Sequence, residues 1–145
     1  MNLLIMVTFT ILYYNYIKMK NTILSVVKYS YYLSIIILII LYLFPGSLIG
    51  YFLYGNLGLQ PQIISNPFGT SINHLIFFSF ITILAKIISH RFKNFYADVR
   101  FILFLSIFLE LSHLLIPNRA FEFYDLFGNI LGVLLIIVLF KFFKW

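Results

Sequence analysis

The sequence predicts an all-α membrane protein folded as a four-helix transmembrane bundle, with an extra short apolar helix at the N-terminus left open. Hydrophobic residues make up 63% of the 145 residues and charged residues only 10%, whereas soluble domains carry about 25% charged residues. The apolar residues also fall into helix-length runs that end at proline, glycine or clustered charges. The net charge of +6 comes from cations beside these runs, so we expect contacts with lipid headgroups and no nucleic-acid partner.

The first apolar run, residues 1–17, is too short for an ordinary span, because it would extend only about 25 Å as a helix. It lacks the basic start and the cleavage site of a signal peptide. It is an extra short span, an interfacial helix, or the product of a start placed upstream of Met19, and we favour the last two interpretations. We therefore predict an N-terminal extension over residues 1–18 and a transmembrane domain over residues 19–145.

The longest connection in the chain separates the first two predicted spans. The first span, Tyr29–Phe44, ends at a proline–glycine pair, which breaks a helix. The connection, residues 46–70, has no charged residue and is rich in glycine and proline. This composition predicts an irregular loop lying against the headgroups. We expect Thr70 and Ser71 to cap the second span, Ile72–Ile88.

A short basic loop, residues 90–94, leads to the third and fourth predicted spans. The third span, Asp98–Ile116, stops at a proline. The fourth, Asp125–Phe140, is short for a bilayer, so the lysines that follow it are expected to snorkel. A Gly-x-x-x-Gly motif at residues 128–132 predicts close packing against the third span of the same chain.

The distribution of cations predicts the orientation of the spans. Lysine and arginine residues lie before the first span, between the second and third spans, and after the fourth span. The other two loops hold a single cation, Arg119. The positive-inside rule therefore puts both ends of the four-span core in the cytoplasm and residues 46–70 and 117–124 outside.

Ionisable and amide side chains gather near the outer ends of the predicted spans, and three of the four acidic residues lie between Glu110 and Gly132. In the third span, Glu110 and His113 share a helix face at i, i+3. The candidate residues of this region are His74, Glu110, His113, Arg119, Asp125 and Asn129. We expect them at one depth in the outer leaflet, above a nearly apolar inner half.

A buried carboxylate at Glu110 needs compensation, because an ionised carboxylate in hydrocarbon costs at least about 2.5–3.5 kcal/mol. Glu110 must face the bundle interior, carry a proton or pair with a cation. Arg119 is the first candidate partner, and a protonated His74 or His113 is the second. In the alternative interpretation these groups only hold helices together, as polar pairs in membranes do.

Metal binding is a weaker interpretation of the same residues. Glu110-x-x-His113 with His74 and Asp125 is geometrically conceivable as a four-ligand site. Metal–carboxylate bundles need several Glu-x-x-His motifs, and this sequence has one. We therefore predict neither a metal nor another cofactor.

An ordered set of motifs runs through this region, consisting of His74, Glu110, Pro117-Asn118-Arg119 and the run from Asp125 to Gly132. It resembles the pattern of the VanZ-like membrane proteins, and the resemblance covers about residues 19–143. Two positions depart from that pattern. His113 stands where the family usually has glutamine, and Thr70-Ser71 stands where Asp-Lys often precedes the histidine.

The resemblance implies a multi-pass protein of the bacterial inner membrane, linked in the family's namesake to tolerance of lipoglycopeptide antibiotics. Its outer-leaflet pocket would bind or modify a membrane lipid or a lipid-linked envelope molecule. Two alternatives are a structural assembly subunit and an intramembrane acid/base enzyme acting on a phosphate-containing lipid. The site residues divide into acid/base candidates, Glu110, Asp125 and His74, and binding candidates, Arg119, Asn129 and His113. The sequence predicts no particular oligomeric state.

Overall fold

A computed structural model describes residues 3–65, 69–91 and 97–143, and these residues form five helices and no strand. The helices are α1 (Leu3–Leu43), α2 (Leu48–Tyr54), α3 (Gly69–Arg91), α4 (Val99–Ser112) and α5 (Phe123–Phe142). Among the described helices, three are long and apolar enough to cross a membrane, namely α1, α3 and α5. The all-α prediction is confirmed, and these three helices fit a membrane protein.

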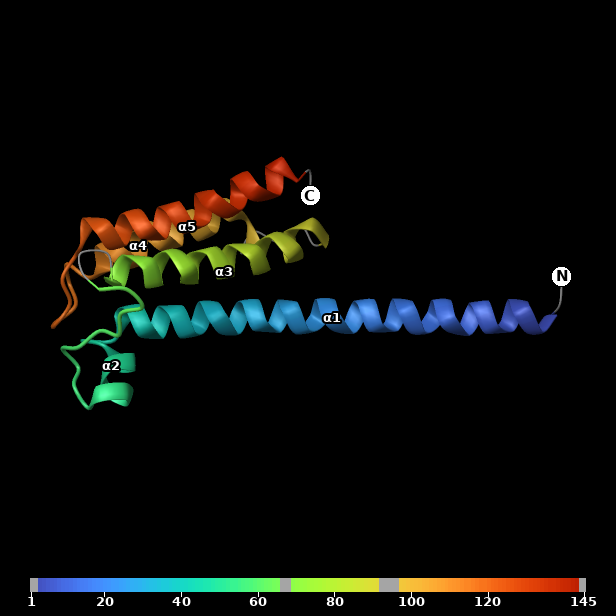
Figure 1. The fold of residues 1–145 in the computed structure, drawn as a ribbon, viewed down its shortest axis with the longest axis horizontal. Helices are drawn as coiled ribbons and strands as arrows, with labels where there is room; N and C mark the ends of the chain where they lie inside the picture. Colours follow the sequence, from blue (N-terminus) through green and yellow to red (C-terminus); the bar gives the residue numbers. More distant parts are fainter. Residues whose placement is uncertain (1–2, 66–68, 92–96, 144–145) are drawn as a thin grey trace.

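The helices are arranged around one crowded end of the molecule. In Figure 1, α3, α4 and α5 lie together beside the C-terminal part of α1, and the N-terminal half of α1 projects beyond them. The C-termini of α1 and α4 and the N-termini of α3 and α5 come together at the end that also carries α2. We call this the loop end of the molecule.

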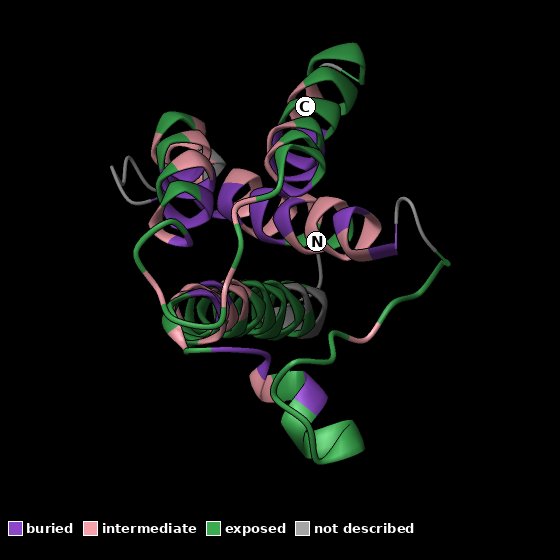
Figure 2. Cartoon of the chain, turned by 90° about the vertical axis from the view of Figure 1, so that its left-hand side faces the viewer, coloured by how far each residue is buried: buried purple, intermediate pink, exposed green. Residues whose placement is uncertain are grey.

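The longest helix, α1, joins two segments that the sequence analysis separated. The predicted extension, residues 1–18, and the predicted first span belong to one helix of 41 residues, about 60 Å long at ~1.5 Å per residue. No proline or glycine interrupts the chain before Pro45, so nothing in the backbone ends the helix earlier. Its N-terminal half is largely exposed (Figure 2).

The connection after α1 is partly helical, whereas the sequence predicted an irregular loop. The Ser47 hydroxyl accepts a hydrogen bond from the Gly50 N–H at 2.9 Å, which caps the start of α2. Gly55 ends α2 in a left-handed conformation with φ +68°. The chain then runs back toward α3, where the Asn73 amide donates to the Pro61 carbonyl at 2.6 Å.

Two boundary predictions need correction. Thr70 and Ser71 do not precede the second helix as caps, because α3 begins at Gly69 and both residues lie in its first turn. The third predicted span is shorter than expected, because α4 ends at Ser112, before the turns that lead to Pro117. With 14 residues, or about 21 Å, α4 is not among the candidate spans. Residues 92–96 of the basic loop lie outside the described residues.

The packing of α5 on α3 depends on the glycine motif. A Cβ atom at Gly128 would lie 2.5 Å from the Ser71 carbonyl oxygen, and one at Gly132 would lie 2.5 Å from that of Leu75. The close contact is intramolecular as predicted, but its partner is α3 and not the third predicted span. Away from the loop end, α3, α4 and α5 bury an apolar core that includes Phe78, Ile81, Ala85, Ile88, Ile102 and Val133.

Candidate functional site: a buried polar cluster beside a cavity

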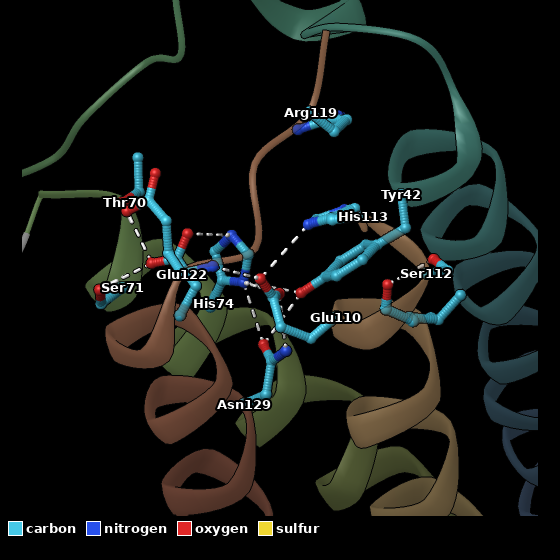
Figure 3. Close-up of polar contacts among 12 residues, drawn as sticks. Tyr42, Thr70, Ser71, His74, Glu110, Ser112, His113, Arg119, Glu122 and Asn129 are labelled. Atoms are coloured by element: carbon cyan, nitrogen blue, oxygen red, sulfur yellow. Dashed lines mark hydrogen bonds and ion pairs between the residues drawn. The ribbon is translucent and has the colours of Figure 1, made fainter. Parts of the chain in front are cut away.

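Polar side chains from four helices meet at the loop end of the bundle (Figure 3). We call this the polar cluster, and its members are Tyr42 of α1, His74 of α3, Glu110 of α4, His113 just after α4, and Asp125 and Asn129 of α5. Glu110 and Asn129 are completely buried, and His113 and Asp125 are 5% exposed. The structure therefore brings together five of the residues that the sequence singled out, and Tyr42 joins them.

His74 is the centre of the polar cluster. Its Nε2 lies 3.5 Å from Asp125 Oδ2, and its Nδ1 lies 3.7 Å from Glu110 Oε2. The same Nδ1 is 2.7 Å from the Tyr42 hydroxyl and 3.0 Å from Asn129 Oδ1. One imidazole thus bridges two carboxyl groups that belong to different helices.

The hydrogen bonds of Asn129 indicate where a proton sits on His74. The amide nitrogen of Asn129 donates to the Ser106 carbonyl at 3.3 Å and to Glu110 Oε2 at 3.4 Å, so its Oδ1 is left as the acceptor. The Tyr42 hydroxyl donates to this oxygen at 2.9 Å. Since Oδ1 only accepts, the Nδ1 of His74 must be the donor in its contact with Asn129.

The partners of Glu110 are histidines and amides. His113 Nδ1 lies 3.3 Å from Glu110 Oε1, and the Glu122 backbone N–H donates to the same oxygen at 3.4 Å. In the part of the chain that the structure describes, no ion pair joins Glu110 to Arg119, the partner that the sequence placed first. The second candidate partner was a protonated His74 or His113; both rings lie near Glu110, and their protonation stays a prediction.

Asp125 receives hydroxyl donors at the start of α3. The Ser71 and Thr70 hydroxyls donate to Asp125 Oδ1 at 2.7 and 3.1 Å. Both hydroxyl groups thus link α3 to α5.

Glu122 lies just before α5, between Glu110 and Asp125 in the sequence. Partial burial together with the charges of Asp125 and Glu110 raises its pKa.

Arg119 lies at the edge of the polar cluster and binds the end of α1. Its Nη2 donates to the Leu41 carbonyl at 2.6 Å and its Nε to the Phe44 carbonyl at 3.3 Å. The last carbonyls of a helix lack partners within the helix, and a cation is favoured there. Burial lowers the pKa of Arg119. Among the described residues, no carboxylate forms an ion pair with this guanidinium.

A cavity of about 130 Å³ opens beside the polar cluster, between α1, α3 and the chain around α2. Leu38, Leu41 and Phe77 supply apolar lining, and Asn73, His113 and Arg119 supply polar lining. Two buried atoms at these positions, Asn73 Oδ1 and His113 Nε2, have no hydrogen-bond partner among the described residues. A buried polar atom without a partner costs free energy, which makes these atoms candidates for ligand contacts.

Sequence reasoning missed Tyr42 and Asn73 as members of the site. Tyr42 is one of 11 tyrosines, and no neighbouring motif distinguishes it from the others. Asn73 directly precedes His74, and an amide beside a histidine inside an apolar run was the available signal. No group of three or more metal-ligating side chains in the described part of the chain is arranged to hold an ion.

Comparison of the chain with protein-family models, curated proteins and solved structures finds no match. The case for a function therefore depends on the geometry of the polar cluster and the cavity.

Proposed function

We propose that this chain is a VanZ-like multi-pass membrane protein that binds the anionic headgroup of a lipid or lipid-linked envelope molecule at the loop end. The observation that carries the proposal is the guanidinium of Arg119, which lines the cavity. Two of its N–H groups are used by the α1 carbonyls. An arginine has five such donors, and arginine is well suited to phosphate and carboxylate.

The walls of the cavity support a lipid as the bearer of this headgroup. Apolar side chains of α1 and α3, among them Leu38 and Phe77, line the cavity next to its polar groups. Ligand sites in proteins are mostly apolar with a few placed polar groups. A molecule with an apolar chain and an anionic end matches this arrangement better than a wholly polar solute does.

The proposed placement has the loop end outside the cytoplasmic membrane of a bacterium and both ends of the four-span core inside. Arg119 is the one cation in the two loops at the loop end, while lysines occur elsewhere along α1, α3 and α5, including Lys28, Lys86 and Lys141. The positive-inside rule favours this orientation. In this proposal α4 is a fourth, shorter membrane segment, and local thinning of the bilayer accommodates its length.

A structural assembly subunit is the second candidate function, and the completeness of the polar cluster favours it. Tyr42, His74 and Asn129 connect α1, α3 and α5 through hydrogen bonds of 2.7–3.0 Å. Such bonds hold helices together in a membrane without any ligand. The two candidates differ in what they require of Arg119, because only headgroup binding needs its remaining donors.

Substitution of Arg119 tests the proposal. We expect Arg119→Gln to reach the membrane at normal yield but to lose co-purified anionic lipid, and Arg119→Lys to retain part of it. Lys141→Gln is the matched control, because it removes one cation from the last turn of α5. Equal lipid content in wild type and Arg119→Gln would contradict headgroup binding, and a collapse of yield in both Arg119 variants would favour the structural role. Sensitivity of an expressing bacterium to glycopeptides tests the link to antibiotic tolerance.

A further inference from the structure

The cavity has unmatched acceptors as well as a cation, and this combination restricts the chemistry of its ligand. Arg119 offers donors and positive charge, whereas Asn73 Oδ1 and His113 Nε2 are buried atoms without a partner in the described part of the chain. A ligand that complements all three residues carries anionic oxygens together with at least one O–H group. This reasoning depends on the headgroup binding proposed above and deepens it by naming the headgroup.

The state of His113 follows from its other ring nitrogen. Nδ1 faces Glu110 Oε1 at 3.3 Å, and a carboxylate oxygen accepts hydrogen bonds, so Nδ1 carries the proton. When the imidazole is neutral, Nε2 has a lone pair and accepts, and the proposal below takes the ring in this state. Stacking on Tyr42, with ring centroids 5.1 Å apart, holds the ring in place. The side chain is 5% exposed and belongs to a residue that lines the cavity, so an unpartnered acceptor is fixed close to the cavity.

The orientation of Asn73 is set by the Pro61 carbonyl. This carbonyl accepts from Asn73 Nδ2 at 2.6 Å, so the other end of the amide is the oxygen, and that oxygen is the unpartnered atom. Asn73 lies on α3 and His113 follows α4. Two elements thus each present an acceptor from the lining of one cavity.

We propose that the cavity binds a phosphate monoester carried at the end of an apolar chain. The anionic phosphate oxygens accept from Arg119, and the P–OH group of the monoanion donates to His113 Nε2 or Asn73 Oδ1. Phosphate monoesters have their second pKa near 6, so this proton is available close to neutral pH. A phosphate diester has no P–OH, and a diester whose second ester carries no hydroxyl group leaves both acceptors unmatched.

The size of the cavity agrees with a small headgroup. Its volume of about 130 Å³ corresponds to roughly four water molecules at ~30 Å³ each. That space suits a phosphate group and the first atoms of its ester. The apolar chain would continue past Leu38 and Phe77, which line the same cavity.

Lipid selectivity of the purified full-length protein tests the proposal directly. Native mass spectrometry would count bound phosphatidic acid, a monoester, against phosphatidylmethanol, a diester with no hydroxyl group, with inorganic phosphate as a third arm. We expect phosphatidic acid to bind at least about tenfold more tightly than phosphatidylmethanol, because one hydrogen bond to a charged group contributes about this much to affinity. Inorganic phosphate shares the headgroup chemistry and lacks the chain, so we expect it to bind more weakly than phosphatidic acid.

Variants assign the selectivity to residues. Asn73→Ala should reduce the preference for phosphatidic acid by about three- to tenfold. Ser79→Ala is its matched control, because Ser79 lies on the same helix and also donates one side-chain bond to a backbone carbonyl, that of Gly132, at 3.2 Å. His113→Phe should lower the preference further, and His113→Gln, which restores an amide acceptor, should recover part of it.

The outcomes separate this inference from the function on which it depends. Equal binding of both lipids, with both lost in Arg119→Gln, would overturn the monoester assignment and leave headgroup binding intact. Failure of either lipid to bind the wild type would overturn both. Inorganic phosphate binding as tightly as phosphatidic acid would overturn the role of the apolar chain. If the His113 variants do not fold, the wild-type comparison and Asn73→Ala still decide the question.

Discussion

The two halves of the α3–α4–α5 bundle are stabilised by different forces, although the same helices form both. At the loop end, buried carboxyl, imidazole and hydroxyl groups contact one another over 2.7–3.7 Å. In the other half, the same helices meet through apolar side chains such as Ile81 and Ile102, with Thr82 bonded to its own helix at the Phe78 carbonyl. Helices in lipid gain little from the hydrophobic effect when they associate. We infer that the polar half fixes the order and rotation of the helices, while the apolar half supplies close packing.

The largest difference between the halves should appear when one member of the polar cluster is removed. We expect Glu110→Ala to lower the free energy of unfolding by about 3–5 kcal/mol, because it leaves buried partners uncompensated. Ile102→Val in the apolar half should cost about 0.5–1.5 kcal/mol. Thermal unfolding of the detergent-solubilised protein measures both. If Glu110→Ala costs no more than Ile102→Val, the contrast between the halves does not exist.

The glycine contact between α3 and α5 should be the next most sensitive feature, because both halves depend on it. Gly132→Ala places a Cβ 2.5 Å from the Leu75 carbonyl oxygen, and such overpacking typically costs about 1–3 kcal/mol. Gly58→Ala is the control, since its nearest neighbour is the Asn56 side chain at 3.3 Å. The midpoint of thermal unfolding should fall for Gly132→Ala only. Equal effects would mean that α5 does not need its close approach to α3.

A smaller effect is expected at the start of α4, away from the loop end. Asp98 Oδ1 accepts from the Arg100 N–H at 2.8 Å, and loss of such a cap in Asp98→Ala costs about 1 kcal/mol. Hydrogen bonds from Arg100 lower the pKa of Asp98 to about 2. A lowered carboxyl pKa stabilises the fold above the ordinary value near 3.8, and this contribution is lost as the pH falls toward 2.

Unfolding midpoints between pH 7 and pH 2 measure this contribution. The gap between wild type and Asp98→Ala should narrow through the acid range. Asp98→Asn is the control, because it keeps a cap while removing the charge. A gap that stays constant down to pH 2 would contradict the role of the charge.

The smallest expected effect concerns Glu122, at the exposed rim of the polar cluster. Its pKa is raised in the folded protein, chiefly by burial, so ionisation is less favourable there than in the unfolded chain. Protonated Glu122 therefore stabilises the fold below its ordinary pKa near 4.5. This stabilisation is lost as the pH rises through the pKa that Glu122 has in the folded protein. Glu122→Gln should therefore be more stable at neutral pH, by a few tenths of a kcal/mol after solvent screening. Unfolding titrations at pH 7 and pH 4 measure the stability of Glu122→Gln relative to wild type. If this difference is no larger at pH 7 than at pH 4, burial does not disfavour the ionised form of Glu122.

The sequence predicted the helical class and much of the polar cluster for identifiable reasons. Apolar runs located the helices, and the i, i+3 spacing placed Glu110 and His113 on one helix face. The bonds of Arg119 could not be predicted, because backbone carbonyl acceptors have no signature in the sequence. The glycine motif was assigned to the wrong neighbour because helix order along the chain does not state which helices touch.

The length of α1 was predicted wrongly for a different reason. We divided the segment at its lysines, on the assumption that a membrane helix has the length of one bilayer crossing. The backbone follows helix-breaking residues instead, and none occurs before Pro45. The positions of the lysines therefore do not mark the ends of this helix, whereas the first helix-breaking residue does.

The hydrogen bonds from Arg119 hold the C-terminal end of the long helix α1 in place. A 41-residue helix behaves as a stiff rod, so a shift of the end held at Leu41 and Phe44 also displaces the opposite end. A ligand that draws the guanidinium away from these carbonyls would release the C-terminal end of α1. A change in the tilt of α1 would then move its N-terminal end, far from the ligand.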